Sequence, residues 1–168
     1  SLSIKNLTRS VGSQFNFAQG ILSFANNAAN NRVLDSSALS DIFNANHTLL
    51  QGRTLDTGGP VTLSSPLQLD GGTFSVSSVT LGTEEAFRTN LFWQTGELRF
   101  TDTDLNIGDS GPLGPTVNLV PGQNLVVTNG GMANDGELNV IGTTASFVGD
   151  ISLGEGLGST GTLNVDGA

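Results

Sequence analysis

The residues with the strongest claim to chemistry lie in one segment, TDTDLNIGDSG, at positions 101–111. It holds Asp102, Asp104 and Asp109, and carboxylate oxygens are ligands that calcium prefers in proteins. Asp102 and Asp104 are two positions apart, so both would lie on one side at the entry to a strand. The segment is therefore a candidate for a loosely held calcium ion.

The known calcium motifs do not fit this segment. An EF-hand loop starting at Asp102 needs glycine where Ile107 stands and glutamate where Leu113 stands. The tandem glycine-rich calcium repeat is also missing from the sequence. Aspartate often bonds to nearby backbone groups in turns, so the favoured interpretation is a corner between two strands. We expect no cofactor and no metal requirement.

Catalytic residues are not expected elsewhere. The chain has no cysteine and one histidine, His47, which lies in NANHTLL without a serine in a nucleophile-elbow context. Sugar-processing sites usually surround their carboxylates with basic and aromatic residues, and this chain has one tryptophan and no tyrosine. Trp93 could stack on a sugar, but its place beside Leu91 favours the core or an aromatic ladder with Phe92 and Phe100. We expect a protein without enzymatic activity.

The charges are distributed unevenly along the chain. Residues 100–168 carry eight acidic residues and no basic one. All six basic residues lie in the first 99 positions: Lys5, Arg9, Arg32, Arg53, Arg88 and Arg99. Such an acidic surface repels phosphate backbones, so we expect no nucleic-acid partner. No segment is long and apolar enough to predict a membrane span.

The elements that must carry these residues are short strands. Glycine, asparagine, serine and threonine are plentiful, and all four disfavour helix. Pairs of apolar residues flank one polar residue, which is typical of a half-buried strand. The predicted inward pairs are Leu67/Leu69, Val79/Leu81, Leu91/Trp93, Leu105/Ile107, Val117/Leu119, Leu125/Val127, Leu138/Val140, Ile151/Leu153 and Leu163/Val165.

These strands repeat one another in sequence. LNI, VNL and two copies of LNV each place asparagine between the apolar residues. GELRF, GELNV and GTLNV each begin a strand with glycine and a polar residue. Self-similarity at this short period predicts a solenoid, in which each coil is buried by its neighbours. The alternative is a β-sandwich, which also has many short strands but no reason to repeat their sequence.

Residues 1–50 do not share the repeat clearly, and we interpret them as an N-terminal capping or assembly segment before solenoid repeats at 51–168. SLSIKNL alternates like an edge strand. SSALSDIFNA at 36–45 predicts one or two helical turns, with Ser36 or Ser37 as the N-cap. A solenoid needs such a cap because an uncovered end exposes strand edges and core.

The segments LLQGRTL, LQLDGGTFSV, LFWQTGELRF, DLNIGDSGPLG, VNLVPGQNLVV and NDGELNV carry a family resemblance. The chain from residue 46 to 168 resembles the repeats of autotransporter-passenger-like and adhesin-like bacterial surface proteins, including planctomycete and cyanobacterial ones with a C-terminal sorting tail. The resemblance implies a right-handed parallel β-helix. It also implies a location outside the cell or at its surface.

The sequence therefore predicts a structural or adhesive β-solenoid module of a bacterial surface, matrix or filament protein. We expect the chain to be a piece of a longer precursor. Its partners would be other surface or matrix components, polysaccharide, or copies of itself, because two strand-bearing ends of unlike charge favour head-to-tail contact. The alternative function is a carbohydrate-binding or carbohydrate-processing β-helix, which would need a groove for the sugar.

Overall fold

A computed structural model describes residues 1–10, 13–24, 31–43, 46–154 and 159–166. Nearly all regular structure in them is strand, as the composition predicts. The strands are β1 (Leu2–Ile4), β2 (Gly20–Phe24), β3 (Arg32–Leu34), β4 (Thr48–Leu50), β5 (Arg53–Asp56), β6 (Pro60–Leu63), β7 (Leu67–Val76), β8 (Ser78–Val79), β9 (Leu91–Thr101), β10 (Leu105–Ile107), β11 (Thr116–Leu119), β12 (Gln123–Thr128), β13 (Met132–Asn134), β14 (Glu137–Ile141), β15 (Thr144–Phe147), β16 (Ile151–Leu153) and β17 (Thr162–Asp166). The helices are α1 (Ser36–Phe43) and α2 (Glu84–Asn90).

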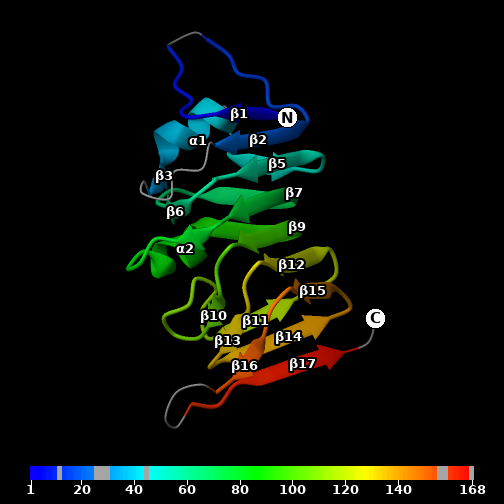
Figure 1. Ribbon diagram of the computed structural model, residues 1–168. Helices are drawn as coiled ribbons and strands as arrows, with labels where there is room; N and C mark the ends of the chain where they lie inside the picture. Colours follow the sequence, from blue (N-terminus) through cyan, green and yellow to red (C-terminus); the bar gives the residue numbers. More distant parts are fainter. Residues whose placement is uncertain (11–12, 25–30, 44–45, 155–158, 167–168) are drawn as a thin grey trace.

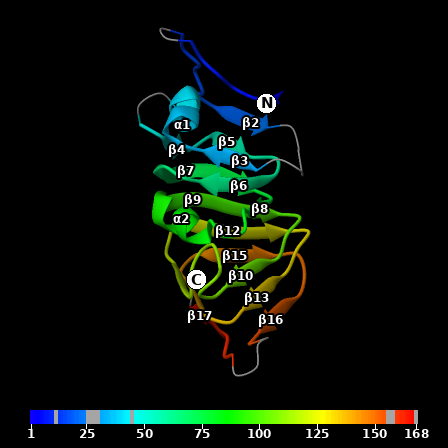
Figure 2. The ribbon, with the colours of Figure 1, turned by 90° about the vertical axis from the view of Figure 1, so that its left-hand side faces the viewer.

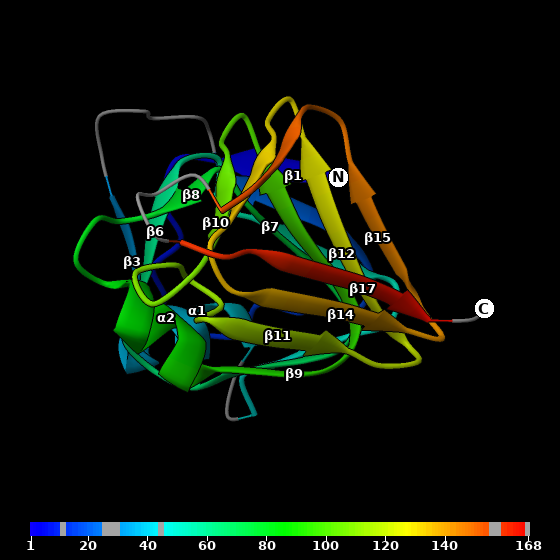
Figure 3. The ribbon, with the colours of Figure 1, turned by 90° about the horizontal axis from the view of Figure 1, so that it is seen from below.

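The strands stack into a parallel β-solenoid of about six turns (Figure 1). Every described pairing is parallel, which excludes the β-sandwich alternative, because a sandwich is built from antiparallel sheets. Seen from below, the chain runs counter-clockwise from β14 through β15 and β16 to β17 while approaching the viewer (Figure 3). The coils are therefore right-handed, which confirms the predicted right-handed parallel β-helix.

The solenoid has three faces. The first face is one long sheet in the order β1-β2-β5-β7-β9-β12-β15. The second face consists of two separate sheets, β3-β6-β8 and β10-β13-β16 (Figure 2). The third face begins with β4 and the first halves of β7 and β9, and ends with the sheet β11-β14-β17.

The core consists of columns of apolar side chains, one from each coil. On the first face, the pairing register stacks Leu22, Leu55, Phe74, Leu98 and Leu125, and all five are buried. Equivalent columns on the other faces include the predicted pairs that begin at Leu105, Val117 and Leu138. The period-2 pattern therefore gave the correct register for most of the chain.

The predicted pairs differ from the structure at two places. Leu81 is 93% exposed, because the chain leaves the short strand β8 and turns toward α2, with Gly82 at a φ of +82°. In the last coil, Ile151, Leu153 and Val165 stand in the inward columns but remain exposed. No further coil lies beyond them in the part of the chain that the structure describes.

Tight corners link the faces. A Cβ atom on Gly136 would lie 2.2 Å from the carbonyl oxygen of Pro115 one coil above, so only glycine fits there. The neighbouring Asn134 is fully buried. Its side-chain amide donates to the carbonyl of Thr162 at 2.8 Å, and its Oδ1 accepts from the N–H of Gly136 at 3.0 Å. One asparagine thus satisfies backbone groups in two successive coils.

The N-terminal end of the core is covered by α1 and by the segment before β2. Leu39, Ile42 and Phe43 of α1 are buried, and the Phe43 ring lies 6.0 Å from that of Phe17. Arg9 forms an ion pair with Asp41 at 3.5 Å. These contacts agree with the predicted atypical N-terminal cap.

Two details of this region were not predicted. Asp35, and not Ser36 or Ser37, caps α1, since its Oδ1 accepts from the N–H of Ala38 at 2.8 Å. Strands β2, β3 and β4 also join the ladders of the solenoid, so the coils continue across residue 50.

At one level of the solenoid, strand pairing is interrupted on two of the three faces, and we call this level the seam. Among the described residues, β8 does not pair with β10, and the first half of β9 does not pair with β11. Only the first face continues through the seam, where β9 pairs with β12. The seam is filled by α2 and by the loop of residues 108–115. The Phe87 ring lies 6.2 Å from the Phe74 ring and 6.4 Å from the Phe100 ring, so α2 packs on β7 and β9, on the N-terminal side of the seam.

Candidate functional site

The three candidate aspartates all lie next to the seam, at corners. Asp102 has a φ of 60°, and its Oδ1 accepts from the side-chain amide of Asn129 at 3.0 Å, one coil below. Asp104 Oδ1 accepts from the N–H of Gly131 at 2.7 Å. Both carboxylates therefore accept hydrogen bonds that hold adjacent coils together, as predicted for aspartates at a corner between strands.

Asp109 lies in the loop after β10, and its backbone carbonyl accepts from Arg88 at 3.1 Å. In the described ranges, no three His, Cys, Asp or Glu side chains gather closely enough to hold a metal ion. The hypothesis of a loosely held calcium ion stays a prediction, and a melting experiment given in the Discussion tests it.

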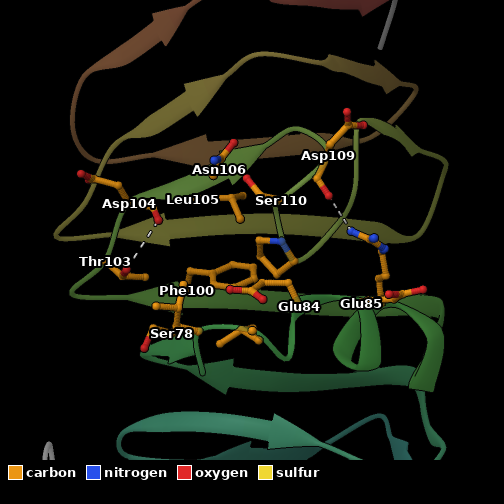
Figure 4. A pocket seen from close by; sticks show the side chains of 15 residues that line it. Ser78, Glu84, Glu85, Phe100, Thr103, Asp104, Leu105, Asn106, Asp109 and Ser110 are labelled. Carbon is orange, nitrogen blue, oxygen red and sulfur yellow. Dashed lines mark hydrogen bonds between the residues drawn. The ribbon is translucent and has the colours of Figure 1, made fainter. Parts of the chain in front are cut away.

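The seam opens into a cleft of about 580 Å³ on the second face. We call it the seam cleft. Figure 4 shows its walls, which come from β8 and α2 on one side and from the β9–β10 corner and the following loop on the other. It is lined by Ser78, Val79, Leu81, Gly82, Glu84, Glu85, Arg88, Phe100, Thr103, Asp104, Leu105, Asn106, Asp109, Ser110 and Pro112.

The cleft exists because the second face lacks one set of ladder bonds. The Thr80 N–H donates to Val61 O at 2.9 Å, toward the N-terminal end of the solenoid. The Leu105 N–H donates to Gly131 O at 3.0 Å, toward the C-terminal end. Neighbouring residues of a parallel strand direct their backbone groups to opposite sides. The backbone groups of Val79 and Asn106 therefore lie on the sides of the two strands that face the seam, where no strand pairs with them.

Asn106 also has an unsatisfied side chain. Its Oδ1 is buried and has no hydrogen-bond partner. A buried acceptor without a partner costs free energy, and solvent in the cleft does not reach this one. Glycine at position 111 packs against the same residue, where a Cβ atom would lie 2.1 Å from the Asn106 carbonyl oxygen.

The charges of the cleft are arranged around Glu84. Figure 4 shows the Glu84 carboxylate over the middle of the cleft, whereas the carboxylates of Asp104 and Asp109 point away from it. Arg88 donates to the carbonyls of Asp109 and Gly111, both at 3.1 Å, so the one basic residue of the lining is engaged in holding the loop. The cleft thus presents a negative charge and several hydrogen-bond acceptors.

The single histidine, His47, and the single tryptophan, Trp93, both contact other parts of the fold. His47 Nε2 lies 2.9 Å from the Ser40 hydroxyl, an unexpected serine–histidine pair, but no described acidic side chain completes a triad with it. Trp93 packs against the core and donates from Nε1 to the carbonyl of Gly96 at 3.2 Å. The predicted aromatic ladder of Trp93, Phe92 and Phe100 does not form, and Phe92 is 54% exposed. The rings that pack together are those of Phe74, Phe87 and Phe100.

Arg32 has an unusual environment near the N-terminal end. Its guanidinium carbon lies 3.8 Å from the centre of the Phe24 ring, and it donates to the carbonyl of Lys5 at 3.1 Å. Burial lowers the pKa of Arg32 below its ordinary value. An arginine pKa starts so high that the side chain stays cationic at neutral pH.

The C-terminal end of the solenoid is a second surface of interest. We call it the open end. It consists of the outer edges of β15, β16 and β17, with which no described strand pairs. Its exposed apolar residues are Val148, Ile151, Leu153 and Val165, of which Val165 is 75% exposed.

No protein-family model, no curated protein and no solved structure matches this chain. Neither helix in the described part is both long and apolar enough to cross a membrane. The fold and these two surfaces are therefore the basis for any functional proposal.

Proposed function

We propose that this protein is a non-enzymatic structural or adhesive solenoid module that assembles head to tail, as part of a bacterial surface, matrix or filament protein. The open end is the observation that supports the assembly. The location outside the cell rests on the sequence resemblance alone. The expectation of no enzymatic activity rests on the residue types of the sequence, which has no cysteine, no tyrosine and one histidine.

The open end has the properties of an unfinished core. No described strand pairs with the outer edges of β15, β16 and β17, and Ile151, Leu153 and Val165 continue the buried columns above them. Soluble proteins usually protect such edges with charge, proline or a covering segment. Exposed apolar residues gathered beside free edges are typical of an interaction surface.

The favoured occupant of the open end is a second copy of this chain, because the two ends have opposite charge. Residues 1–50 contain three basic residues and two acidic ones, Asp35 and Asp41, so the N-terminal segment is weakly positive. Residues 142–168 contain three acidic residues and no basic one. Two open ends would therefore repel each other, whereas an open end and an N-terminal end would attract.

The N-terminal end also has strand edges with which no described strand pairs. β1, β3 and β4 are each the first strand of their ladder, and they belong to the first, second and third face respectively. The open end carries its edges on the same three faces. A contact between two different ends is heterologous, so repeated contacts build a filament and not a closed dimer.

Assembly of the purified chain tests this proposal. We expect sedimentation velocity to show concentration-dependent growth that high salt weakens, and negative-stain microscopy to show rods longer than one solenoid. Val165→Lys places a charge at an exposed site, so it should leave folding intact and abolish growth. Deletion of residues 1–10 removes β1 and should do the same.

Phe92→Lys is the matched control, because Phe92 is an exposed apolar residue on the outer side of the third face, away from both ends. It should assemble like the original chain. A chain that stays monomeric at every salt and protein concentration contradicts the proposal. Unchanged filaments after deletion of residues 1–10 would rule out β1 as the connector.

A further inference from the structure

We propose that a single strand ladder joins successive copies in the head-to-tail assembly: β15 of one copy pairs in parallel with β1 of the next, with Ser146 opposite Ser3. The segment between β1 and β2 acts as a plug that fills the junction on the other two faces. This inference rests on the proposed function and deepens it, because it names the strands, their register and the one face that crosses the junction.

The first face has the same unfinished columns at both ends. Through the pairings of β2, β5, β7, β9 and β12, Leu2 at the N-terminal end and Ala145 at the C-terminal end belong to one inward column. Two residues further along each strand, Ile4 and Phe147 pack against the core and are only partly buried. Each end therefore has apolar side chains that one more strand would cover.

These columns fix the register of the junction. If Ala145 continues into Leu2, the outward residues Ser146 and Ser3 lie opposite each other, because side chains alternate between the two sides of a strand. Both serines are exposed, and neither brings a charge to the ladder. A slip by one residue would place serine in the inward column and apolar side chains in solvent, so it should be disfavoured.

On the third face, the N-terminal edge is already covered by a charged side chain. The Gln68 N–H donates to the His47 carbonyl at 3.0 Å, so the next carbonyl, that of Thr48, points the opposite way, toward the N-terminal end. There it accepts from Arg53 at 3.3 Å. A cationic side chain bonded along a strand edge disfavours pairing with another strand, so β4 is a poor connector.

On the second face, the cover is the segment that follows β1. Arg32 of β3 donates to the Lys5 carbonyl at 3.1 Å, and residues 6–8 line one small cavity together with residues 32–34. In the part of the chain that the structure describes, no strand pairs with the outer edge of β1. This strand is therefore the N-terminal strand best placed to accept another one.

The seam shows that this solenoid can continue through one face alone. There β9 pairs with β12 from Gly96 to Thr101, while the second and third faces are interrupted. A coil that carries a helix borders this interruption, since α2 lies between β8 and β9. The first coil at the N-terminal end is built in the same way, with α1 between β3 and β4. The proposed junction repeats this construction between two copies.

The segment between β1 and β2 has the chemistry that a plug needs. It rises beyond β1 (Figure 1) and carries two partly buried apolar residues, Leu7 and Phe15, together with the basic residue Lys5. At the junction it would lie against the exposed apolar residues of the open end, next to Asp150. Apolar contact and opposite charge would then both favour the fit.

Cysteine cross-linking of the whole chain tests the junction, because the sequence has no cysteine of its own. Adjacent strands lie about 4.8 Å apart, which suits the Cα–Cα distance of about 4.4–6.8 Å in disulfides. Ser3→Cys combined with Ser146→Cys should link copy to copy under mild oxidation and give trimers and longer multimers on a non-reducing gel. A bond within one chain is excluded, since β2, β5, β7, β9 and β12 separate the two positions.

Two further cysteine pairs are matched controls. Ser3→Cys with Thr144→Cys tests the register, because a shift of two residues adds about 6.6 Å along the strand. Val33→Cys with Ser152→Cys tests the second face, where residues 6–8 would lie between the two strands. Both controls should stay at the background level of multimers, and each single variant can form dimers at most. Each variant must keep the original melting temperature.

Sedimentation velocity of the same chains under reducing conditions separates this inference from the proposed function. Assembly without cross-linking of the Ser3–Ser146 pair would overturn the junction and leave head-to-tail assembly standing. Cross-linking of the Val33–Ser152 pair would mean that the second face also crosses, which overturns the single-face junction. A chain that never assembles overturns both proposals.

Discussion

The two ends of this solenoid solve the same problem in opposite ways. At the N-terminal end, the side chains of α1 and the segment before β2 cover the last layer of the core, and Phe17 and Phe43 are buried there. At the open end, equivalent core positions are left in solvent, with Val165 three-quarters exposed. A repeat therefore does not decide whether a residue is buried; the presence of a neighbouring layer does.

The largest difference in stability should come from placing an aspartate at a buried position and at an exposed position of the same column. Leu119, Val140 and Val165 are stacked in register, and Leu119 is buried whereas Val165 is exposed. Leu119→Asp should lower the free energy of unfolding by about 4 kcal/mol, because an unpaired charge enters the core. Val165→Asp should cost less than about 1 kcal/mol.

Urea unfolding of the monomeric protein measures both values. Leu138→Asp, in the neighbouring column, should behave like Leu119→Asp. If Leu119→Asp kept its full stability, the register described above would be wrong. If Val165→Asp cost as much as Leu119→Asp, the open end would be covered in solution.

A smaller difference should separate two phenylalanines. Phe17 is buried in the N-terminal cap, 6.0 Å from the ring of Phe43, whereas Phe147 is half-buried in the last coil. Phe17→Ala should cost about 3 kcal/mol, because it leaves a cavity that its neighbours cannot fill. Phe147→Ala should cost about 1 kcal/mol, since solvent already reaches that site. Thermal unfolding measures both, and equal losses would contradict the contrast between the ends.

The N-cap of α1 should contribute less than these core residues. Asp35→Ala removes the acceptor of the Ala38 N–H and should cost about 1 kcal/mol. Ser36→Ala and Ser37→Ala are the controls, because these serines were the caps predicted from sequence. We expect each to change stability by less than about 0.5 kcal/mol. A larger loss from either serine than from Asp35 would favour the cap predicted from sequence.

Calcium should have the smallest effect. Asp102 and Asp104 already accept hydrogen bonds from the next coil, so the fold should not depend on an ion between them. We expect the same melting temperature with calcium and with a chelator. A rise of several degrees with calcium would show a bound ion, because a ligand that binds only the folded state stabilises it.

The architecture could be predicted from the sequence because the period-2 alternation of apolar residues depends only on residues close together in the chain. Leu105 and Ile107, or Leu138 and Val140, are inward in any coil that stacks, and the period of two identifies them without knowledge of the partners. The shared asparagines were also a real signal. Asn118, Asn139 and Asn164 form an outer ladder, with side-chain bonds of 2.8 and 2.6 Å.

The sequence could not predict features that depend on how coils meet. Leu81 satisfies the period-2 rule and is still exposed, because the strand is only two residues long and α2 follows at once. The seam cleft arises from pairings that are missing, and missing bonds leave no pattern in a chain. Asn106 shares its motif with the ladder asparagines, yet its place beside the seam gives its Oδ1 atom no partner.

The seam also decides how this rod carries load. Inter-coil hydrogen bonds in a solenoid run along its axis, so a pull on the two ends stresses successive levels in series. The terminal strand β1, which pairs with β2 over three residues, should peel away first. Among the remaining levels, the one with the fewest ladder pairings should separate next. At the seam, backbone ladder bonds on the first face, from Gly96 to Thr101, join the two stacks. We therefore expect stretching to part the molecule between β9 and β12 into two folded blocks, with the first face acting as the hinge until its bonds break.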